Sequence, residues 1–439
     1  MCTCHSEVYP KRRKAFIEAA SAKEPDLVAV FASAPVFTRN NDVEHEYRQD
    51  SDLFYLTGFN EPGTVLVMDG KKVTMFVRPR DPERETWDGP RYGVDGVKEH
   101  FGADEAFTID KLSDPECGLP KLFQGKKRLY YRLGPNRPMD DKVLEGIDRA
   151  RARGKLGHLW PTEIVDPGTI LHEMRLFKHS EDLAAMRKAA DITAEAHLRA
   201  MKSTKPGMHE FQVEAMLLET FRQHGSERPA YGSIVGSGAN ATILHYRANN
   251  RKMEDGELLL IDAGCEYDYF ASDVTRTFPV GGKFNKQQEA IYNLVLDAQL
   301  AGIEKTRKGS SIEAIHNTCV EVITKGLVGL GLLEGDVDTL IKEEKYKPFY
   351  MHKTCHWLGM DVHDVGNYYV GGKSRPLEPG MVLTVEPGIY IAKDYDKVPA
   401  EWRGIGVRIE DDILVTDGEP DNLTASIPKK PSELLAAVA

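Results

Sequence analysis

A chain of 439 residues, 41% hydrophobic and 28% charged, has the length of two globular domains and shows no compositional bias. Its formal net charge of −11 argues against a nucleic-acid-binding protein, which needs a basic surface. No apolar run approaches the roughly 18 residues of a membrane span, so no membrane partner is expected. The six cysteines are scattered, which fits a reducing compartment and predicts a cytoplasmic protein.

The N-terminal part of the chain predicts a small α/β domain. Turn signals and helix-like charged stretches separate short strand-like runs at Leu27–Phe31, Thr64–Met68 and Lys72–Val77. A helix is predicted to begin at Ser180, where two acidic residues precede apolar side chains at helical spacing. We therefore predict an N-terminal domain over residues 1–173 and a C-terminal domain over residues 174–439.

The second half of the chain predicts antiparallel strands that alternate with long helices. Strands are expected at 257–280, which also contains a turn, at 381–392 and at 404–418. Amphipathic helices are predicted at 286–306 and 311–331. Helices packed against a mostly antiparallel sheet indicate an α+β domain.

Acidic residues interrupt the apolar strands of this second half. Asp262, Glu386 and Glu410 each follow or interrupt an apolar run, and Asp273 lies eleven residues after the first of them. Aspartate and glutamate are poor strand formers, and burying one unpaired carboxylate costs about several kcal/mol. These four carboxylates therefore need a shared positive partner.

Two kinds of positive partner are open. Arg408 lies two residues before Glu410 on the same face of its strand and could pair with one acid, but it does not neutralise four. Two divalent cations would balance four carboxylates, and paired ions of this kind serve hydrolysis. Because oxygen donors dominate the set, Mn²⁺ is favoured, with Co²⁺, Fe²⁺ and Zn²⁺ as alternatives.

Three histidines, His352, His356 and His363, fall within twelve residues, and His245 stands apart. A lone histidine is more often structural than a ligand, but three together indicate a site. The residue after His352 is Lys353 and not the glutamate of the zinc-protease helix motif, which excludes that motif. One imidazole can supply a nitrogen ligand and the others can donate to a developing oxyanion, but the spacing does not decide which.

Five motifs of the second half occur in an order typical of one family: "IDAGCEY", "SDVTRTFPV", "HWLGMDVHDVG", "TVEPGIYI" and "GVRIEDDILVT". With them the chain resembles the metallopeptidases of the pita-bread fold, and within these the bacterial aminopeptidase P (Xaa-Pro aminopeptidase) family. The likeness extends to the first half through "EYRQDSDLFYLTGFNEP" and "RDPERETWDGPRYG". It implies a pita-bread catalytic domain after a smaller α/β domain, and removal of the N-terminal residue from peptides with proline in second position.

The resemblance also implies which side chains hold two divalent ions. Its five ligand positions are occupied here by Asp262, Asp273, His356, Glu386 and Glu410. Among them Glu386 is the expected general base, which takes a proton from water and passes it to the leaving proline nitrogen.

Further roles follow from the same resemblance. His245, His352 and His363 are expected to line the site, and Arg408 to orient the carboxylates. A homodimer or homotetramer is implied, in which the N-terminal domain serves oligomerisation and substrate access and a loop with Trp87 reaches a neighbouring subunit's site. Two alternatives stay open: a prolidase restricted to dipeptides, and a non-catalytic partner-binding protein of the same fold, which the five intact ligands disfavour.

Overall fold

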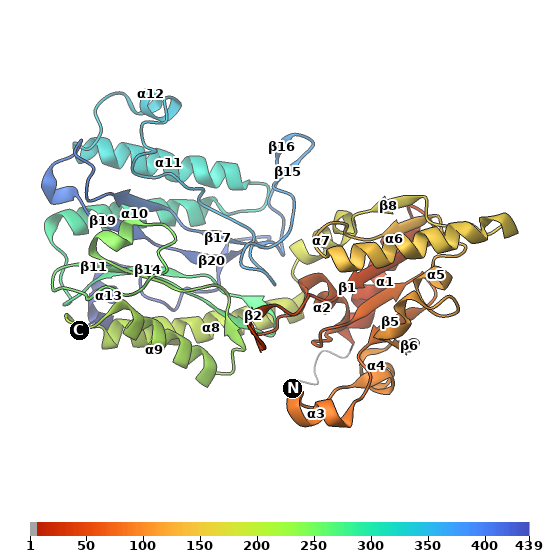
Figure 1. Cartoon of the computed structure of the whole chain (residues 1–439). Helices are drawn as coiled ribbons and strands as arrows, with labels where there is room; N and C mark the ends of the chain where they lie inside the picture. Colours follow the sequence, from red (N-terminus) through yellow and green to blue (C-terminus); the bar gives the residue numbers. More distant parts are fainter. Residues whose placement is uncertain (1–6, 439) are drawn as a thin grey trace. The chain divides into compact units, whose positions relative to one another are not determined.

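The structure is a computed structural model that describes residues 7–438. The chain divides into two compact units, Met1–Met174 and Arg175–Ala439, and each has a hydrophobic core of its own (Figure 1). Within the described residues, every helix is too short or too polar to cross a membrane.

The N-terminal unit is built on one mixed sheet with the strand order β6-β5-β4-β1-β7-β8. Its strands are β1 (Leu27–Ala32), β4 (Val65–Met68), β5 (Val73–Val77), β6 (Glu105–Thr108), β7 (Arg128–Tyr130) and β8 (Glu163–Val165), with β2 (Thr38–Asn40) and β3 (Val43–Glu44) forming a separate hairpin. Pairing of β4 with β1 and β5 is antiparallel, whereas β5 with β6, β1 with β7 and β7 with β8 are parallel. The expected α/β domain is therefore present.

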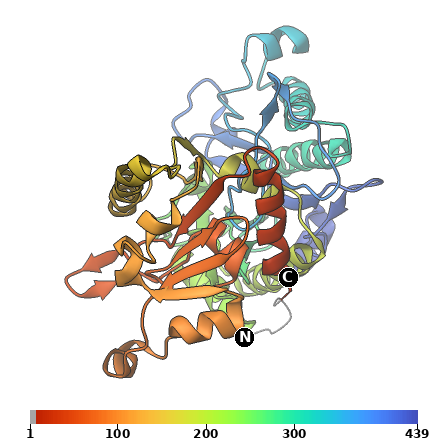
Figure 2. The same cartoon turned by 90° about the vertical axis from the view of Figure 1, so that its right-hand side faces the viewer.

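Helices flank that sheet. They are α1 (Val8–Ser21), α2 (Ser51–Thr57), α3 (Pro82–Asp88), α4 (Gly93–Phe101), α5 (Leu119–Leu122) and α6 (Arg137–Ala152), and α7 (Gly168–Leu176) runs across the division between the units. Figure 2 shows α1, in red, beside the strands. Its buried Phe16 packs edge-on against Phe31 and Tyr130, which ties the helix to β1 and β7.

The C-terminal unit pairs its described strands in antiparallel fashion throughout. The strands are β9 (Arg228–Pro229), β10 (Ile234–Ser237), β11 (Leu258–Asp262), β12 (Cys265–Tyr267), β13 (Phe270–Ala271), β14 (Thr275–Pro279), β15 (Tyr369–Val370), β16 (Lys373–Ser374), β17 (Val382–Val385), β18 (Gly388–Ile391), β19 (Ile405–Arg408), β20 (Asp411–Leu414) and β21 (Asp421–Asn422). The helices are α8 (Ser180–Ser203), α9 (Glu210–Gln223), α10 (Lys286–Lys305), α11 (Ile312–Gly329), α12 (Val337–Lys342) and α13 (Pro431–Val438).

These helices enclose the strands. Figure 1 shows α8 and α9 along one side of the strands and α10 and α11 along the other. Apolar side chains of β11, β14 and β19 fill the core between them, and Ile261, Phe278 and Val407 are fully buried. The α+β class predicted from the sequence is confirmed.

Two strands predicted as continuous are each interrupted by a glutamate. The run 381–392 divides into β17 and β18, and the run 404–418 divides into β19 and β20. Val385 pairs with Asp411 and Gly388 with Arg408 in one unbroken register, so the residues between them face each other. Glu386 therefore lies opposite Glu410, an arrangement of like charges that disfavours regular pairing.

Candidate metal centre

The two aspartates are brought together by adjacent strands. Asp262 ends β11 and pairs with Thr275 of β14, and Asp273 comes two residues before Thr275, which places it on the same face. The Tyr231 hydroxyl lies 2.6 Å from Asp262 Oδ1 and also hydrogen-bonds the Asp273 carboxylate. One phenol thus holds both carboxylates in place.

The two glutamates come from the strand interruptions. Glu410 is 1% exposed, its Oε2 accepts from Thr275 Oγ1 at 2.6 Å, and its N–H donates to the Thr275 carbonyl at 3.1 Å. The Glu386 N–H donates to the Thr354 carbonyl at 2.8 Å. Backbone hydrogen bonds therefore fix both glutamates, of which Glu410 is buried and Glu386 is 17% exposed.

His356 completes the cluster with a nitrogen donor. Its Nδ1 lies 3.0 Å from the Trp357 carbonyl, so in the neutral imidazole Nδ1 can donate to that carbonyl and leave Nε2 to bind a cation. Nε2 lies 3.3 Å from Asp273 Oδ2 and 3.7 Å from Glu386 Oε1. Ligand atoms of Asp273, His356 and Glu410 lie within 4.8 Å of one another. This donor set of carboxylates and one imidazole suits a hard divalent cation.

Charge in the cluster shows the same need for a cation. Burial raises the pKa of Glu386 to about 8, in spite of nearby His356 and Arg408, and burial followed by Asp273 raises the pKa of Glu410 well above its usual range. Burial disfavours protonation of His356, yet the hydrogen bond with Asp273 raises its pKa to about 9. Without a metal, the site therefore takes up protons. Divalent ions would instead keep the carboxylates ionised and the imidazole neutral, so the residues present fit a metal.

Arg408 pairs with Asp262. Its Nη2 donates to Asp262 Oδ2 at 2.5 Å, its Nε to Thr275 Oγ1 at 3.1 Å and its Nη1 to the Tyr390 hydroxyl at 2.9 Å. That hydroxyl in turn lies 2.8 Å from His352 Nε2. Arg408 thus orients one carboxylate directly and links it to a histidine through Tyr390.

The other predicted histidines lie around the cluster. The rings of His363 and His356 meet edge-on with centroids 4.5 Å apart, and burial and then His356 lower the pKa of His363. His245 is exposed after the short helix Gly238–Thr242 and is close enough to contribute to the lowered pKa values of His352 and His363. All four histidines therefore belong to one neighbourhood, with His245 and His363 at its solvent-exposed edge.

Sequence reasoning missed three polar side chains that hold the carboxylates. Tyr231 and Thr275 are described above, and Asp412 accepts from Ser272 Oγ at 2.8 Å and from the Asp273 N–H at 3.2 Å. Asp412 had a signal, since it is a further acid in the apolar run that contains Glu410. Tyr231 had none, because a single tyrosine in a loop carries no pattern.

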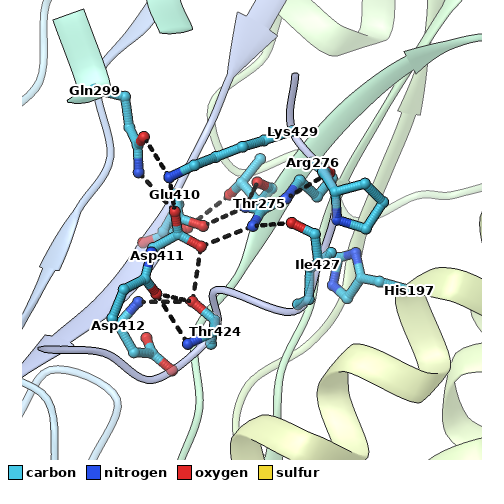
Figure 3. Close-up of polar contacts among 12 residues, drawn as sticks. His197, Thr275, Arg276, Gln299, Glu410, Asp411, Asp412, Thr424, Ile427 and Lys429 are labelled. Carbon is cyan, nitrogen blue, oxygen red and sulfur yellow. Dashed lines mark hydrogen bonds and ion pairs between the residues drawn. The ribbon is translucent and has the colours of Figure 1, made fainter. Parts of the chain in front are cut away.

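Behind Glu410 lies a buried network centred on Asp411, shown in Figure 3. Its Oδ1 accepts from Arg276 NH2 and Thr424 Oγ1, each at 2.7 Å. Its Oδ2 accepts from Gln299 Nε2 at 2.8 Å and from Lys429 Nζ at 2.5 Å. Burial opposes ionisation, but Arg276 and Lys429 outweigh it and lower the pKa of Asp411 below its usual range. The strand next to the site is thereby tied to the C-terminal segment.

Changing Asp411 to Asn is expected to lower the free energy of unfolding by about 3–5 kcal/mol, since Arg276 and Lys429 would lose their buried partner. Because the folded-state pKa of Asp411 is lowered, this stabilisation is present at neutral pH and lost only in strong acid. Urea unfolding at pH 7 measures it. Asp421→Asn, in an exposed pair with Arg187, is the control and should cost below about 1 kcal/mol; equal losses would contradict the prediction.

Comparison with known proteins covers both units. Residues 184–417 match the family model of metallopeptidase family M24, and residues 9–130 match that of the aminopeptidase P N-terminal domain. The chain is 45% identical to a Xaa-Pro aminopeptidase of Escherichia coli K12, over 98% of the chain and 96% of that protein, and 34% identical to Xaa-Pro aminopeptidase 3 of Homo sapiens, over 95% and 82%.

Solved structures are similar over the whole chain. Pseudomonas aeruginosa aminopeptidase PepP superposes with a TM-score of 0.95 and 49% identity, covering 100% of this chain and 98% of that one. A glutamate-to-alanine variant of Escherichia coli aminopeptidase P, in complex with substrate, gives a TM-score of 0.94 and 44% identity over 99% and 98%.

Proposed function

Because the chain belongs to metallopeptidase family M24 and is a Xaa-Pro aminopeptidase, we propose that it works with two divalent ions held by its buried acidic cluster. The pita-bread fold expected from the sequence motifs is confirmed by its structural likenesses. The observation that carries the proposal is the opposition of Glu386 and the buried Glu410 beside Nε2 of His356. Such an arrangement is stable only with positive charge between the carboxylates.

The ligands divide into two overlapping sets. One ion would be held by Asp262, Asp273 and Glu410, and the other by Asp273, His356, Glu386 and Glu410. Asp273, His356 and Glu410 have donor atoms within 4.8 Å of one another. The central positions of Asp273 and Glu410 in the cluster support the proposal that both ions share these two carboxylates. Oxygen donors dominate, which favours Mn²⁺ over Co²⁺, Fe²⁺ or Zn²⁺.

The side chains around the ions supply proton transfer and hydrogen bonds. Bound ions would polarise the scissile carbonyl and make water a nucleophile at neutral pH. Glu386 accepts the proton of that water and returns it to the proline nitrogen, which carries no N–H of its own in the peptide. His363 or His245 donates to the oxygen that becomes negative.

Tripeptides separate this activity from that of a dipeptidase. We expect Ala-Pro-Ala to be cleaved with a kcat/KM at least about tenfold above that of Ala-Pro, measured by release of alanine from the Mn²⁺-loaded chain. The reason is that an aminopeptidase leaves the space beyond proline open, whereas a prolidase closes it with a group for the free carboxylate. Cleavage of Ala-Pro alone would establish the prolidase alternative.

The N-terminal unit would serve assembly and substrate access. Trp87 lies at the end of α3 with 86% of its surface exposed, as an apolar anchor for a neighbouring subunit would be. We expect a homodimer or homotetramer by light scattering, and a change of Trp87 to Ala to shift the mass towards the monomer or to raise KM. A monomeric chain, or a variant that changes neither property, would contradict this role.

We also infer that the protein works in the cytoplasm. Among the described residues Cys117, Cys265, Cys319 and Cys355 are free thiols, which supports a reducing compartment, while Cys2 and Cys4 lie outside the described residues. Fractionation of the source cells tests the location, and recovery of the protein outside the cytoplasm would contradict it.

A further inference from the structure

The loop that carries His363 is closed on itself by hydrogen bonds. The Asp364 N–H donates to the Trp357 carbonyl at 2.9 Å, and the Gly359 N–H donates to the Asp361 carbonyl at 3.2 Å. The Gly359 carbonyl accepts from the Ala271 N–H at 2.8 Å. The loop is therefore attached to β13, but these bonds alone do not determine where the segment at His363 comes to lie.

Two buried cations hold the residue next to His363. Arg175 Nη2 lies 2.7 Å from Asp364 Oδ1, and Lys178 Nζ lies 3.0 Å from Asp364 Oδ2, so each carboxylate oxygen has its own cation. The side chains of Arg175, Lys178 and Asp364 are 3%, 1% and 1% exposed. Arg175 also pairs with Asp361 at 2.8 Å, which gives two cations and two anions in one cluster. These cations belong to the first four residues of the C-terminal unit.

The loop has room for this cluster only because residue 359 is glycine. A Cβ at that position would lie 2.0 Å from Asp364 Oδ2 and 2.9 Å from Lys178 Cε. Both contacts are far inside van der Waals distance, so any larger residue would displace the carboxylate from its cations. The "HWLGMDVHDVG" motif therefore specifies space for the ion cluster as well as its two histidines.

Apolar side chains in place of Arg175, Lys178 and Asp364 would stabilise the fold about as well as these ion pairs do. The cost of removing charges from water offsets most of the attraction between them. The ion pairs also fix the direction of the Asp364 carboxylate, because each of its oxygens is bound by a side chain from a different backbone position, 175 or 178. Asp364 is the chain neighbour of His363, whose ring stands edge-on to His356. The ion pairs of Asp364 thus fix the backbone next to His363, from which its imidazole extends.

We propose that Arg175 and Lys178 are positioning residues, which act through Asp364 to hold His363 against the metal centre. The proposal deepens the function given above and rests on it for the kinetic readout. The ion pairs seen for both cations in the described part of the chain go to Asp361 and Asp364, so their influence on the site passes through the loop.

Lys178→Met tests the proposal, because it removes one cation while nearly keeping the volume. In the Mn²⁺-loaded full chain, kcat for Ala-Pro-Ala should fall by about 10- to 100-fold with Mn²⁺ affinity within about twofold of the parent. In a chain that already carries His363→Ala, adding Lys178→Met should lower kcat by less than about threefold. Equal losses with and without His363 would overturn the proposal, since they indicate general destabilisation.

Two other variants serve as controls. Lys178→Arg keeps the charge and should retain kcat within about threefold. Lys126→Met removes a pair of similar length with Asp69, 3.1 Å, which is more exposed and lies in the N-terminal unit, and it should leave kcat within about twofold. Should Lys178→Met fail to fold, Asp361→Asn, which removes the second anion paired with Arg175, should lower kcat by about two- to tenfold, and again only when His363 is present.

Nuclear magnetic resonance of ¹³C-histidine-labelled protein adds a readout independent of turnover. The His363 ring signal, identified by its loss in His363→Ala, should shift or broaden in Lys178→Met while the His209 signal stays in place. An unchanged His363 signal would overturn the positioning role. If the signal moves but the parent chain cleaves no Xaa-Pro peptide, the proposed function fails while the positioning stands.

Discussion

Changing Glu386 to Gln is expected to lower kcat for Ala-Pro-Ala by at least about 10³-fold. The change removes the carboxylate that would accept the proton of water, and general-base catalysis alone contributes about 10²–10⁴-fold. It also removes a charged ligand opposite Glu410, which weakens the hold on the second ion. Steady-state kinetics with saturating Mn²⁺ measure the loss.

Two companion measurements make this result decisive. Metal content by mass spectrometry separates loss of the base from loss of the ion, because a fully loaded but inactive variant has lost proton transfer. Glu378→Gln, which changes a half-exposed glutamate paired with Arg375, is the matched control and should keep kcat within about twofold. Near-normal turnover by a metal-replete Glu386→Gln chain would remove Glu386 from the mechanism.

Removing the metal should abolish turnover, and adding Mn²⁺ back should restore it. The physical reason lies in the cluster itself: burial raises the pKa of Asp262, of Glu386 to about 8, and of Glu410. Without cations the cluster therefore favours protonated carboxyls, which leaves neither a cation to polarise the substrate carbonyl nor an ionised base at Glu386. Activity after chelation and after titration with Mn²⁺, Co²⁺, Fe²⁺ and Zn²⁺ measures this dependence.

Stability should follow the metal as well. A ligand bound only by the folded chain adds about 2.7 kcal/mol to the free energy of unfolding when its concentration is 100 times its Kd. The thermal midpoint is therefore expected to rise with Mn²⁺ concentration in the parent chain and to rise less in Asp273→Asn, which has lost a shared ligand. Full activity of a chain with no detectable metal would refute the two-ion proposal at its root.

The ligand chemistry could be predicted from sequence because it breaks a local rule. Acids such as Glu386 and Glu410 stand in apolar strands, where an unpaired carboxylate is costly, and this conflict is visible without coordinates. The histidines were harder. Spacing alone did not distinguish His352, His356 and His363, and the structure shows that among these three His356 brings one ring nitrogen within 3.7 Å of two of the carboxylates.

The supporting residues could not be predicted, because each acts on a partner far away in the chain. Tyr231 meets Asp273 from 42 residues away, and Thr275 meets Glu410 from 135. Arg408 shows the difference most clearly. The sequence indicated an arginine close to the acids, but its hydrogen bond goes to Asp262, 146 residues earlier, across paired strands.

The sequence by itself determined the α+β class, the identity of the family and the chemical type of the site, since these depend on local pattern and on residue types in order. Only the tertiary structure decided which oxygens face one another. The opposition of Glu386 and Glu410 depends on strand register, and the hold of Arg175 and Lys178 on Asp364 depends on segments about 190 residues apart folding together. Register and long-range contact are properties of the packed chain, and no periodicity in the sequence encodes them.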